Sequence, residues 1–263
     1  ARYGLDKPIF VRYVLWLKEI VQGNFGYSII EKRDVSDMLA ERLPNTLELA
    51  ILSMFLANLW ATIAGVIAAL KQYSVVDYTL TVISFTLSGI PQFFVGLVFI
   101  LIFAVQLHWL PLAGIRTANV PFDLWDHTKH LIMPVVVLSL PAASVLRQAR
   151  SAMLEELNKD YAVVARSKGL AERTINTRHV FRNALLPLIT LYGLQLPQLL
   201  GGSVIVETIF EWPGMGKLGV DSAVMKDYST LMAITSITAV MVLLANLITD
   251  ISYAWVDPRI RYN

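Results

Sequence analysis

Few residues in this chain have the types and spacing that chemistry requires, and the first candidate is a short glycine-rich stretch. Residues 214–217 read Gly-Met-Gly-Lys, which partly matches a phosphate-binding loop. That loop requires G-x-x-x-x-G-K-[ST], but Glu211 stands at the first glycine position and Leu218 follows the lysine. The stretch therefore predicts a turn in an outward-facing loop, with Trp212 and Pro213 packing at the membrane edge.

A second candidate is a pair of histidines. His127 and His130 are three residues apart, so they could lie on one helix face as metal ligands. The nearby carboxylates are only Asp123 and Asp126, which favours a membrane-interface position over a metal site. The chain has no cysteine, which excludes disulfides, thiolate metal sites and cysteine nucleophiles. With no Ser/His/Asp set and no H-E-x-x-H, a membrane-embedded enzyme is not supported.

The composition predicts that lipid surrounds most of the chain. The 263 residues are 56% hydrophobic and 16% charged, against about 25% charged in soluble domains. The low content of charged residues is concentrated in long segments that have no charge at all, which indicates an integral membrane protein. The net charge of +2 gives no basic stripe of the kind that nucleic-acid binding requires.

The uncharged segments predict five membrane spans, because roughly 20 apolar residues cross the hydrocarbon core. Pro91 follows Gly89 inside the second segment, and proline breaks a helix, so we expect a short helix, a break near residues 89–91 and then a span. The third segment has a short apolar core. The predicted spans are 46–70, 79–107, 131–149, 184–206 and 230–249.

The distribution of basic residues predicts the orientation. The 147–183 loop holds eight Lys and Arg residues, whereas 108–130 and 207–229 hold two each. The positive-inside rule places the first of these loops in the cytoplasm. The C-terminal tail, 257–263, is then cytoplasmic, and the segment 1–45 is extracytoplasmic with residue 1 outside. Exporting that segment requires an upstream span, so we expect six spans in the full-length product.

Polar side chains inside the fourth span could bond to neighbouring helices, which is the common role of such groups in lipid, or line a translocation path for a polar solute. They are Tyr192, Gln195 and Gln198. The absence of carboxylates at the span centres argues against a proton-driven carrier, and no filter or charged ring suggests a channel. Other candidates for the path are Pro91, Phe94, Gly201 and Gly202, and the prolines could also serve helix bending.

The stretch 160–170 (DYAVVARSKGL) is the segment that best suits an interaction. A helix-permissive run ends at Gly169, where a left-handed C-cap favours glycine. A second polar helix, 171–183, is expected to lead into the fourth span. Small alanines beside Gly169 would let a partner approach, as for a short helix seated in a groove. The alternative is a solvated basic loop that only sets topology.

This stretch resembles the EAA loop of ABC importer permeases, most closely the dipeptide, oligopeptide and nickel permease family. The matching residues include Asp160-Tyr161, Ala165-Arg166 and Lys168-Gly169-Leu170. The general motif opens Glu-Ala-Ala, whereas residues 163–165 here are Val-Val-Ala, and Gly169 is farther from Pro187 than in the general motif; both features are typical of the peptide branch. Further matches are 182–187 (RNALLP), 3–8 (YGLDKP), 43–49 (LPNTLEL), 90–97 (IPQFFVGL), 201–207 (GGSVIVE), 212–216 (WPGMG) and 257–260 (DPRI).

The resemblance implies an all-α integral membrane protein with the type I ABC importer permease fold, with residues 46–256 as its transmembrane domain. It implies a peptide pathway shared with a second homologous permease subunit, two ABC ATPase subunits, an extracytoplasmic solute-binding protein, and ATP and Mg held only by the ATPases. Relatives that carry nickel, metal chelates or oligosaccharides are the alternative. The implied ATPase-coupling residues are Asp160, Tyr161, Ala165, Arg166, Lys168, Gly169, Leu170, Arg182, Asn183 and Pro187, and the implied outer-mouth residues are Glu207, Trp212, Pro213 and Gly214.

Overall fold

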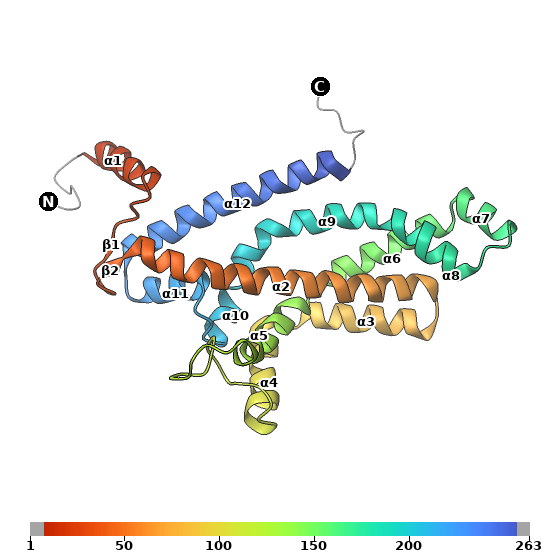
Figure 1. Ribbon diagram of the computed structural model, residues 1–263, viewed down its shortest axis with the longest axis horizontal. Helices are drawn as coiled ribbons and strands as arrows, with labels where there is room; N and C mark the ends of the chain where they lie inside the picture. Colours follow the sequence, from red (N-terminus) through yellow and green to blue (C-terminus); the bar gives the residue numbers. More distant parts are fainter. Residues whose placement is uncertain (1–7, 257–263) are drawn as a thin grey trace.

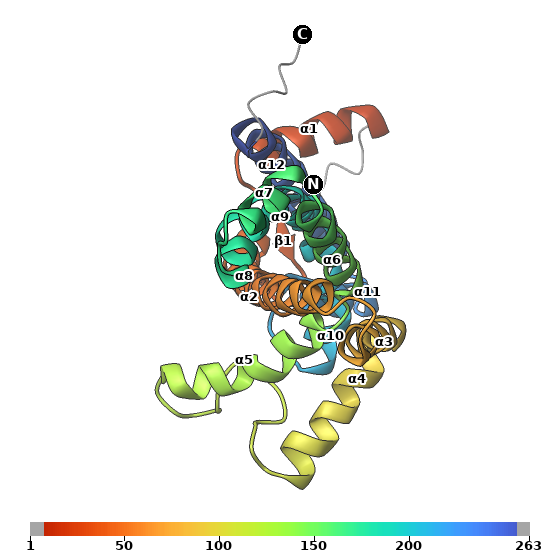
Figure 2. The ribbon, with the colours of Figure 1, turned by 90° about the vertical axis from the view of Figure 1, so that its right-hand side faces the viewer.

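Long helices that run roughly side by side form the body of the molecule (Figures 1 and 2). The computed structural model describes residues 8–256, except for the side chains of 196–202, 250 and 252–256. The longest helix, α2 (Val35–Leu70), lies against α6 (Ala143–Leu157) and α5 (Leu124–Ser139). The helix α9 (Phe181–Gly202) packs along α12 (Tyr228–Val256) and also contacts α6.

Shorter elements connect these helices and extend from both ends of the body. The only sheet among the described residues is a hairpin that pairs Tyr27 with Asp34. It lies at the end of the molecule opposite to α7 (Figure 1). The remaining elements are α1 (Ile9–Val21), β1 (Tyr27–Ser28), β2 (Arg33–Asp34), α3 (Val75–Gly89), α4 (Gln92–Phe99), η1 (Ile100–Gln106), α7 (Asp160–Ser167), α8 (Glu172–Thr174), η2 (Ile175–Val180), α10 (Val204–Ile209) and α11 (Met215–Val224).

Two single helices and two bent helix pairs have the length and apolar character of membrane spans, which gives two to four candidates among the described residues. The single helices are Val35–Leu70 and the Tyr228–Thr249 part of α12. The pair Val75–Gly89 and Gln92–Gln106 is bent by 98°, which confirms the break predicted at Pro91. The predicted fourth span coincides with α9, but that helix ends at Gly202, before the predicted end.

Two boundaries differ from the sequence prediction. The helix that contains the predicted first span, α2, begins at Val35 and passes through Pro44, so part of the predicted 1–45 segment belongs to it. The predicted third span is not one helix, because the chain bends by 63° between Ser139 and Ala143, around Pro141. The second half of the pair, α6, then continues to Leu157. The first residues of the predicted 147–183 loop are therefore helical and packed against α2.

The contact between α2 and α6 depends on small residues. Ala61 and Ala64 of α2 pack on Val145 and Leu146 of α6 in one buried cluster. A Cβ atom added at Gly65 would lie 2.5 Å from the Leu146 carbonyl oxygen and 2.7 Å from the Ala149 Cβ. Small side chains let helix backbones approach closely, which is the main source of packing energy between helices in lipid.

Candidate functional site

A glycine cap ends the short helix α7, as the sequence predicted. Gly169 has a φ of 77°, a conformation that costs other residues roughly 1–2 kcal/mol. The Gly169 N–H donates to the Arg166 carbonyl at 2.9 Å, and the Leu170 N–H donates to the Ala165 carbonyl at 3.3 Å. This pair of bonds defines a Schellman cap, which turns the chain back toward the body at α8.

One face of α7 is anchored in the protein. Ala162 and Ala165 are buried in a cluster that also contains Met153 of α6 and Ile175 and Val180 of η2. Small side chains on this face let α7 lie close to its neighbours. The cluster therefore fixes the position of α7 relative to the helices that lead into the membrane.

The opposite face of α7 is uncovered and largely apolar. Val163 and Val164 are 54% and 48% exposed, and Leu170 is exposed beyond the cap. A Cβ atom at Gly169 would meet nothing within 4 Å. Lys168 adds a positive charge beside this surface. We call Val163, Val164, Lys168, Gly169 and Leu170 the outer face; it lies at the far end of the molecule (Figure 1).

A buried carboxylate that the sequence analysis did not identify joins α7 to α6, beside α9. Glu156 of α6 is only 12% exposed and accepts from the Lys159 ammonium at 2.5 Å. It also accepts from the Tyr161 hydroxyl at 2.6 Å, and the Asn183 side chain of α9 lies beside this pair. Burial and the bond to Glu156 raise the pKa of the Tyr161 phenol. The predicted residues Tyr161 and Asn183 thus meet at Glu156.

The other predicted coupling residues lie around this anchor. Arg166 donates to Glu172 at 2.8 Å and to the Leu157 carbonyl at 3.2 Å, which holds α7 against α8. Asp160 is exposed at the first position of α7, where a carboxylate stabilises the helix dipole. Arg182 and Pro187 are exposed on α9.

Beyond the cap of α7, a second run of helix leads into the body of the protein. The elements α8, η2 and α9 follow one another from Glu172 to Gly202, which confirms the predicted second helix. The π-helical turn η2 joins α8 to α9. One helical rod therefore runs from Glu172, beyond the cap of α7, to Gly202 at the end of α9.

The predicted outer-mouth residues are buried at the opposite end. Trp212 is completely buried against Leu49 and Leu131, and its indole N–H donates to the Asn45 carbonyl at 3.0 Å. This packing differs from the membrane-edge position expected for Trp212, because a large ring with a paired N–H is stable inside a core. The Pro213 carbonyl accepts from the Asn45 side chain at 2.8 Å.

Glu207 caps the helix that contains the Gly-Met-Gly-Lys stretch. It is completely buried and accepts from the Lys217 N–H at 3.0 Å and the Thr46 hydroxyl at 2.9 Å. A Cβ atom at Gly214 would lie 2.4 Å from the Glu207 carboxyl carbon, so only glycine fits there. A carboxylate of the chain itself occupies the N-terminus of α11, which agrees with rejecting a phosphate loop.

The candidate path residues do not form one group. The Tyr192 hydroxyl hydrogen-bonds to Thr62 of α2, and Gln195 is half-buried on α9. Pro91 and the exposed Phe94 belong to the start of α4, which projects away from α9 (Figures 1 and 2). The positions of Gln198, Gly201 and Gly202 lie in α9, where side chains are outside the described residues.

Both histidines bond to protein groups. His127 contacts Glu48 at 2.9 Å and the Ile115 carbonyl at 3.0 Å, and His130 contacts the Asp126 carbonyl at 2.9 Å. Within the described part of the chain, no group of three or more His, Cys, Asp or Glu residues is placed to hold a metal ion.

Apolar helices of spanning length and bent helix pairs define a multi-pass helical membrane protein. Residues 61–262 match the family described as binding-protein-dependent transport system inner membrane component, and the chain belongs to this family. It is 48% identical to the oligopeptide transport system permease protein AppB of Bacillus subtilis (strain 168), over 99% of this chain and 83% of the relative.

Further relatives agree with this membership, and a solved structure shares the fold. The di/tripeptide transport system permease protein DppB of Pseudomonas aeruginosa (strain UCBPP-PA14) is 38% identical, over 99% of this chain and 83% of that protein. The glutathione transport system permease protein GsiC of Escherichia coli (strain K12) is 37% identical, over 98% and 82%. The inward-facing MetNI methionine ABC transporter has a similar fold, with a TM-score of 0.66 at 17% identity over 84% of this chain and 96% of that chain.

Proposed function

We propose that this chain is a permease subunit of an ATP-driven importer, and that α7 is the element by which an ATPase subunit moves it. The observation that carries this proposal is the contrast between the two faces of α7. One face is buried against α6 and α9, and Tyr161 bonds to Glu156 of α6. The outer face is largely apolar, carries Lys168 and is exposed at the tip of the molecule. An apolar helix face of this kind fits a groove on a partner.

Peptides are the proposed cargo. The relatives at 37–48% identity are named for oligopeptides, di/tripeptides and glutathione, and they align with nearly the whole chain. Nickel, metal chelates and oligosaccharides remain the alternative cargo classes. Binding assays on the cognate solute-binding protein discriminate between these classes directly.

The proposed assembly contains a second permease subunit, two ATPase subunits and an extracytoplasmic solute-binding protein. ATP and Mg²⁺ belong to the ATPases, and this chain binds no cofactor of its own. The eight Lys and Arg residues of 147–183 support a cytoplasmic position for α7. Residue 1 is then outside and the C-terminal tail, 257–263, is in the cytoplasm.

The proposed motion begins when closure of the ATPases displaces α7. Glu156 of α6 bonds to Lys159 and Tyr161, and Ala162 of α7 lies in one buried cluster with Ala184 of α9. Because of these contacts, α6, α7 and the start of α9 move as one unit. The helical path from Glu172 to Gly202 carries this movement into the membrane. The path for solute opens or closes as these helices shift against α2 and α12.

The test compares Gly169→Arg with Gly169→Ala in the complete transporter. Both substitutions impose the same strain at a φ of 77°, roughly 1–2 kcal/mol, but only arginine adds bulk to the outer face. We expect Gly169→Arg to abolish uptake and to release the ATPases during purification, whereas Gly169→Ala retains most uptake. Coupled uptake in Gly169→Arg, or equal loss in both variants, contradicts docking at this face.

A further inference from the structure

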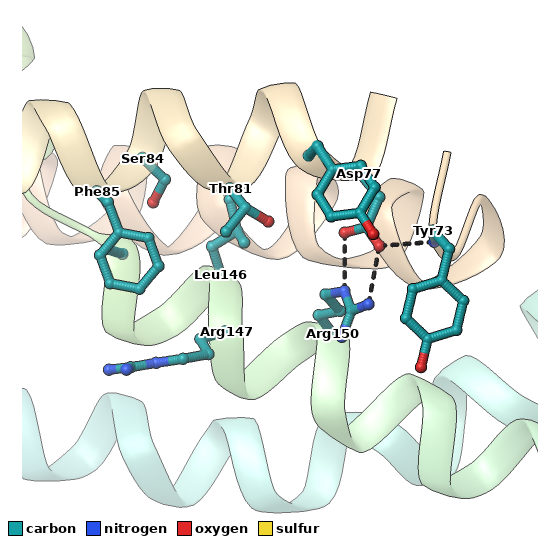
Figure 3. Close-up of a pocket in the computed structure, with 10 residues that line it drawn as sticks. Tyr73, Asp77, Thr81, Ser84, Phe85, Leu146, Arg147 and Arg150 are labelled. Carbon is teal, nitrogen blue, oxygen red and sulfur yellow. Dashed lines mark hydrogen bonds and ion pairs between the residues drawn. The ribbon is translucent and has the colours of Figure 1, made fainter. Parts of the chain in front are cut away.

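A cavity between α3 and α6 has the chemistry of an anion site next to lipid. It has a volume of about 210 Å³ and lies beside the Asp77–Arg150 ion pair (Figure 3). Most of its exposed lining is apolar, contributed by side chains such as Phe85 and Leu146. The coupling and path residues described above do not line it.

The cavity carries one positive charge without a counter-ion. Arg150 donates to both carboxylate oxygens of Asp77 at 2.8 Å, so these two charges neutralise each other. Arg147 lines the same cavity, is exposed and stacks over the Phe85 ring at 5.5 Å. Among the described residues Arg147 forms no ion pair. Its guanidinium is therefore free to bind an anion bidentately.

A buried hydroxyl in the same lining also lacks a partner. Ser84 of α3 is 1% exposed, and its Oγ has no hydrogen-bond partner within the described part of the chain. Figure 3 shows Ser84 on the side of α3 that faces α6. An unsatisfied buried polar group costs about 1–3 kcal/mol, so a ligand that bonds to Ser84 gains stability from this site.

The surface around the cavity is suited to lipid. Val75 and Val82 of α3 are exposed. Because α3 belongs to a candidate membrane span, these apolar side chains are placed to contact lipid. Tyr73 and Tyr78, which line the cavity, are also exposed, and tyrosine is enriched where a membrane meets water. The cavity is smaller than the about 300–1,000 Å³ pockets that enclose drug-sized ligands, so it fits a headgroup and not a whole lipid.

We propose that this cavity binds the phosphate of an anionic phospholipid headgroup, such as phosphatidylglycerol. Arg147 pairs with the phosphate, Ser84 donates a hydrogen bond to the headgroup, and the acyl chains lie along the exposed apolar side of α3. An anionic headgroup neutralises the single free charge, whereas a zwitterionic headgroup brings a second cation beside Arg147. The headgroup then lies in the cytoplasmic leaflet, because α3 begins at the same end of the molecule as α7 (Figure 1). This choice of leaflet rests on the orientation given under the proposed function.

The experiment measures lipid retained by the purified transporter complex. The complex is stripped of lipid by detergent washing, and dihexanoyl phosphatidylglycerol, dihexanoyl phosphatidylcholine or inorganic phosphate is added at matched concentrations. Native mass spectrometry counts bound molecules in the wild type and in three variants. Arg147→Gln removes the cation, Ser84→Ala removes the hydroxyl, and Lys129→Gln is the control. Lys129 also lies 5.5 Å from an aromatic ring, that of Trp125, but does not line this cavity.

We expect phosphatidylglycerol to bind with a roughly tenfold weaker affinity in Arg147→Gln, the loss typical of one charge-assisted contact. Ser84→Ala should weaken binding about threefold, as for a neutral hydrogen bond, and Lys129→Gln should not change it. Equal affinity in the wild type and Arg147→Gln overturns the proposal. If phosphatidylcholine is retained as well as phosphatidylglycerol, the preference for an anionic headgroup is overturned. If inorganic phosphate binds as tightly as phosphatidylglycerol, the ligand is a free anion and the lipid assignment is overturned. These affinities do not depend on transport, so they are separable from the proposed function.

Discussion

Replacing Glu156 with alanine tests whether α7 is rigidly joined to the membrane helices. The substitution removes the acceptor of the Tyr161 hydroxyl and of the Lys159 ammonium. A hydrogen bond to a charged group contributes about 1.5–3 kcal/mol. Tyr161 is half-buried, so water replaces part of the lost bond and the lower end, about 1.5 kcal/mol, applies. A change of 1.4 kcal/mol is a factor of ten in an equilibrium, so local opening of α7 becomes about tenfold more frequent.

Hydrogen exchange on the purified complex measures this opening directly. The amides of 163–168 should lose about tenfold of their protection in Glu156→Ala, because exchange there reports local unfolding. Glu155→Ala is the matched control, since Glu155 is 72% exposed and reaches Lys159 only at 3.5 Å. We expect ATPase subunits to remain bound to Glu156→Ala, with less solute imported per ATP hydrolysed. Unchanged protection in Glu156→Ala, or an equal loss in Glu155→Ala, refutes the anchoring role.

Two further predictions concern the packing of α6. Asp77→Asn leaves Arg150 without its partner and should destabilise the complex by about 3 kcal/mol, the lower end for a buried pair because Arg150 is a quarter exposed. The midpoint temperature of thermal unfolding should fall clearly. The control, Asp221→Asn in the more exposed pair with Lys217, should change this temperature little. Gly65→Ala pushes a methyl group against the Leu146 carbonyl and should cost about 1–3 kcal/mol, measured by the yield of folded complex. Gly89→Ala meets nothing within 4 Å, and an equal loss there argues against close packing as the cause.

The features predicted correctly from the sequence are those that single residues determine. Gly169 takes a positive φ that other residues adopt at a cost, so its position alone predicts the end of α7. Pro91 removes a backbone donor, and the chain bends by 98° between Gly89 and Gln92. The first and last spans follow from long uncharged runs, which the structure retains as α2 and α12.

The features that the sequence did not predict depend on partners distant in the chain. The charge of Arg150 led to its prediction as a loop residue. In the structure Asp77, 73 residues earlier, pairs with Arg150, and α6 continues past it to Leu157. Glu156 carries no local pattern that distinguishes it from Glu155, and only the fold shows which of the two is buried. The burial of Trp212 depends likewise on Asn45 and Leu49 of α2.

Cross-linking from a single cysteine tests the central claim, that the outer face of α7 docks on an ATPase. The chain has no cysteine of its own, so Val164→Cys and Ala165→Cys each introduce one thiol, on the exposed and the buried face respectively. The complete transporter is treated with a short thiol-to-amine cross-linker, and the masses of the products are measured by mass spectrometry. We predict that Val164→Cys gives an adduct with the combined mass of permease and ATPase, and that Ala165→Cys gives none. A Val164→Cys thiol that reacts fully but never joins an ATPase would contradict the claim.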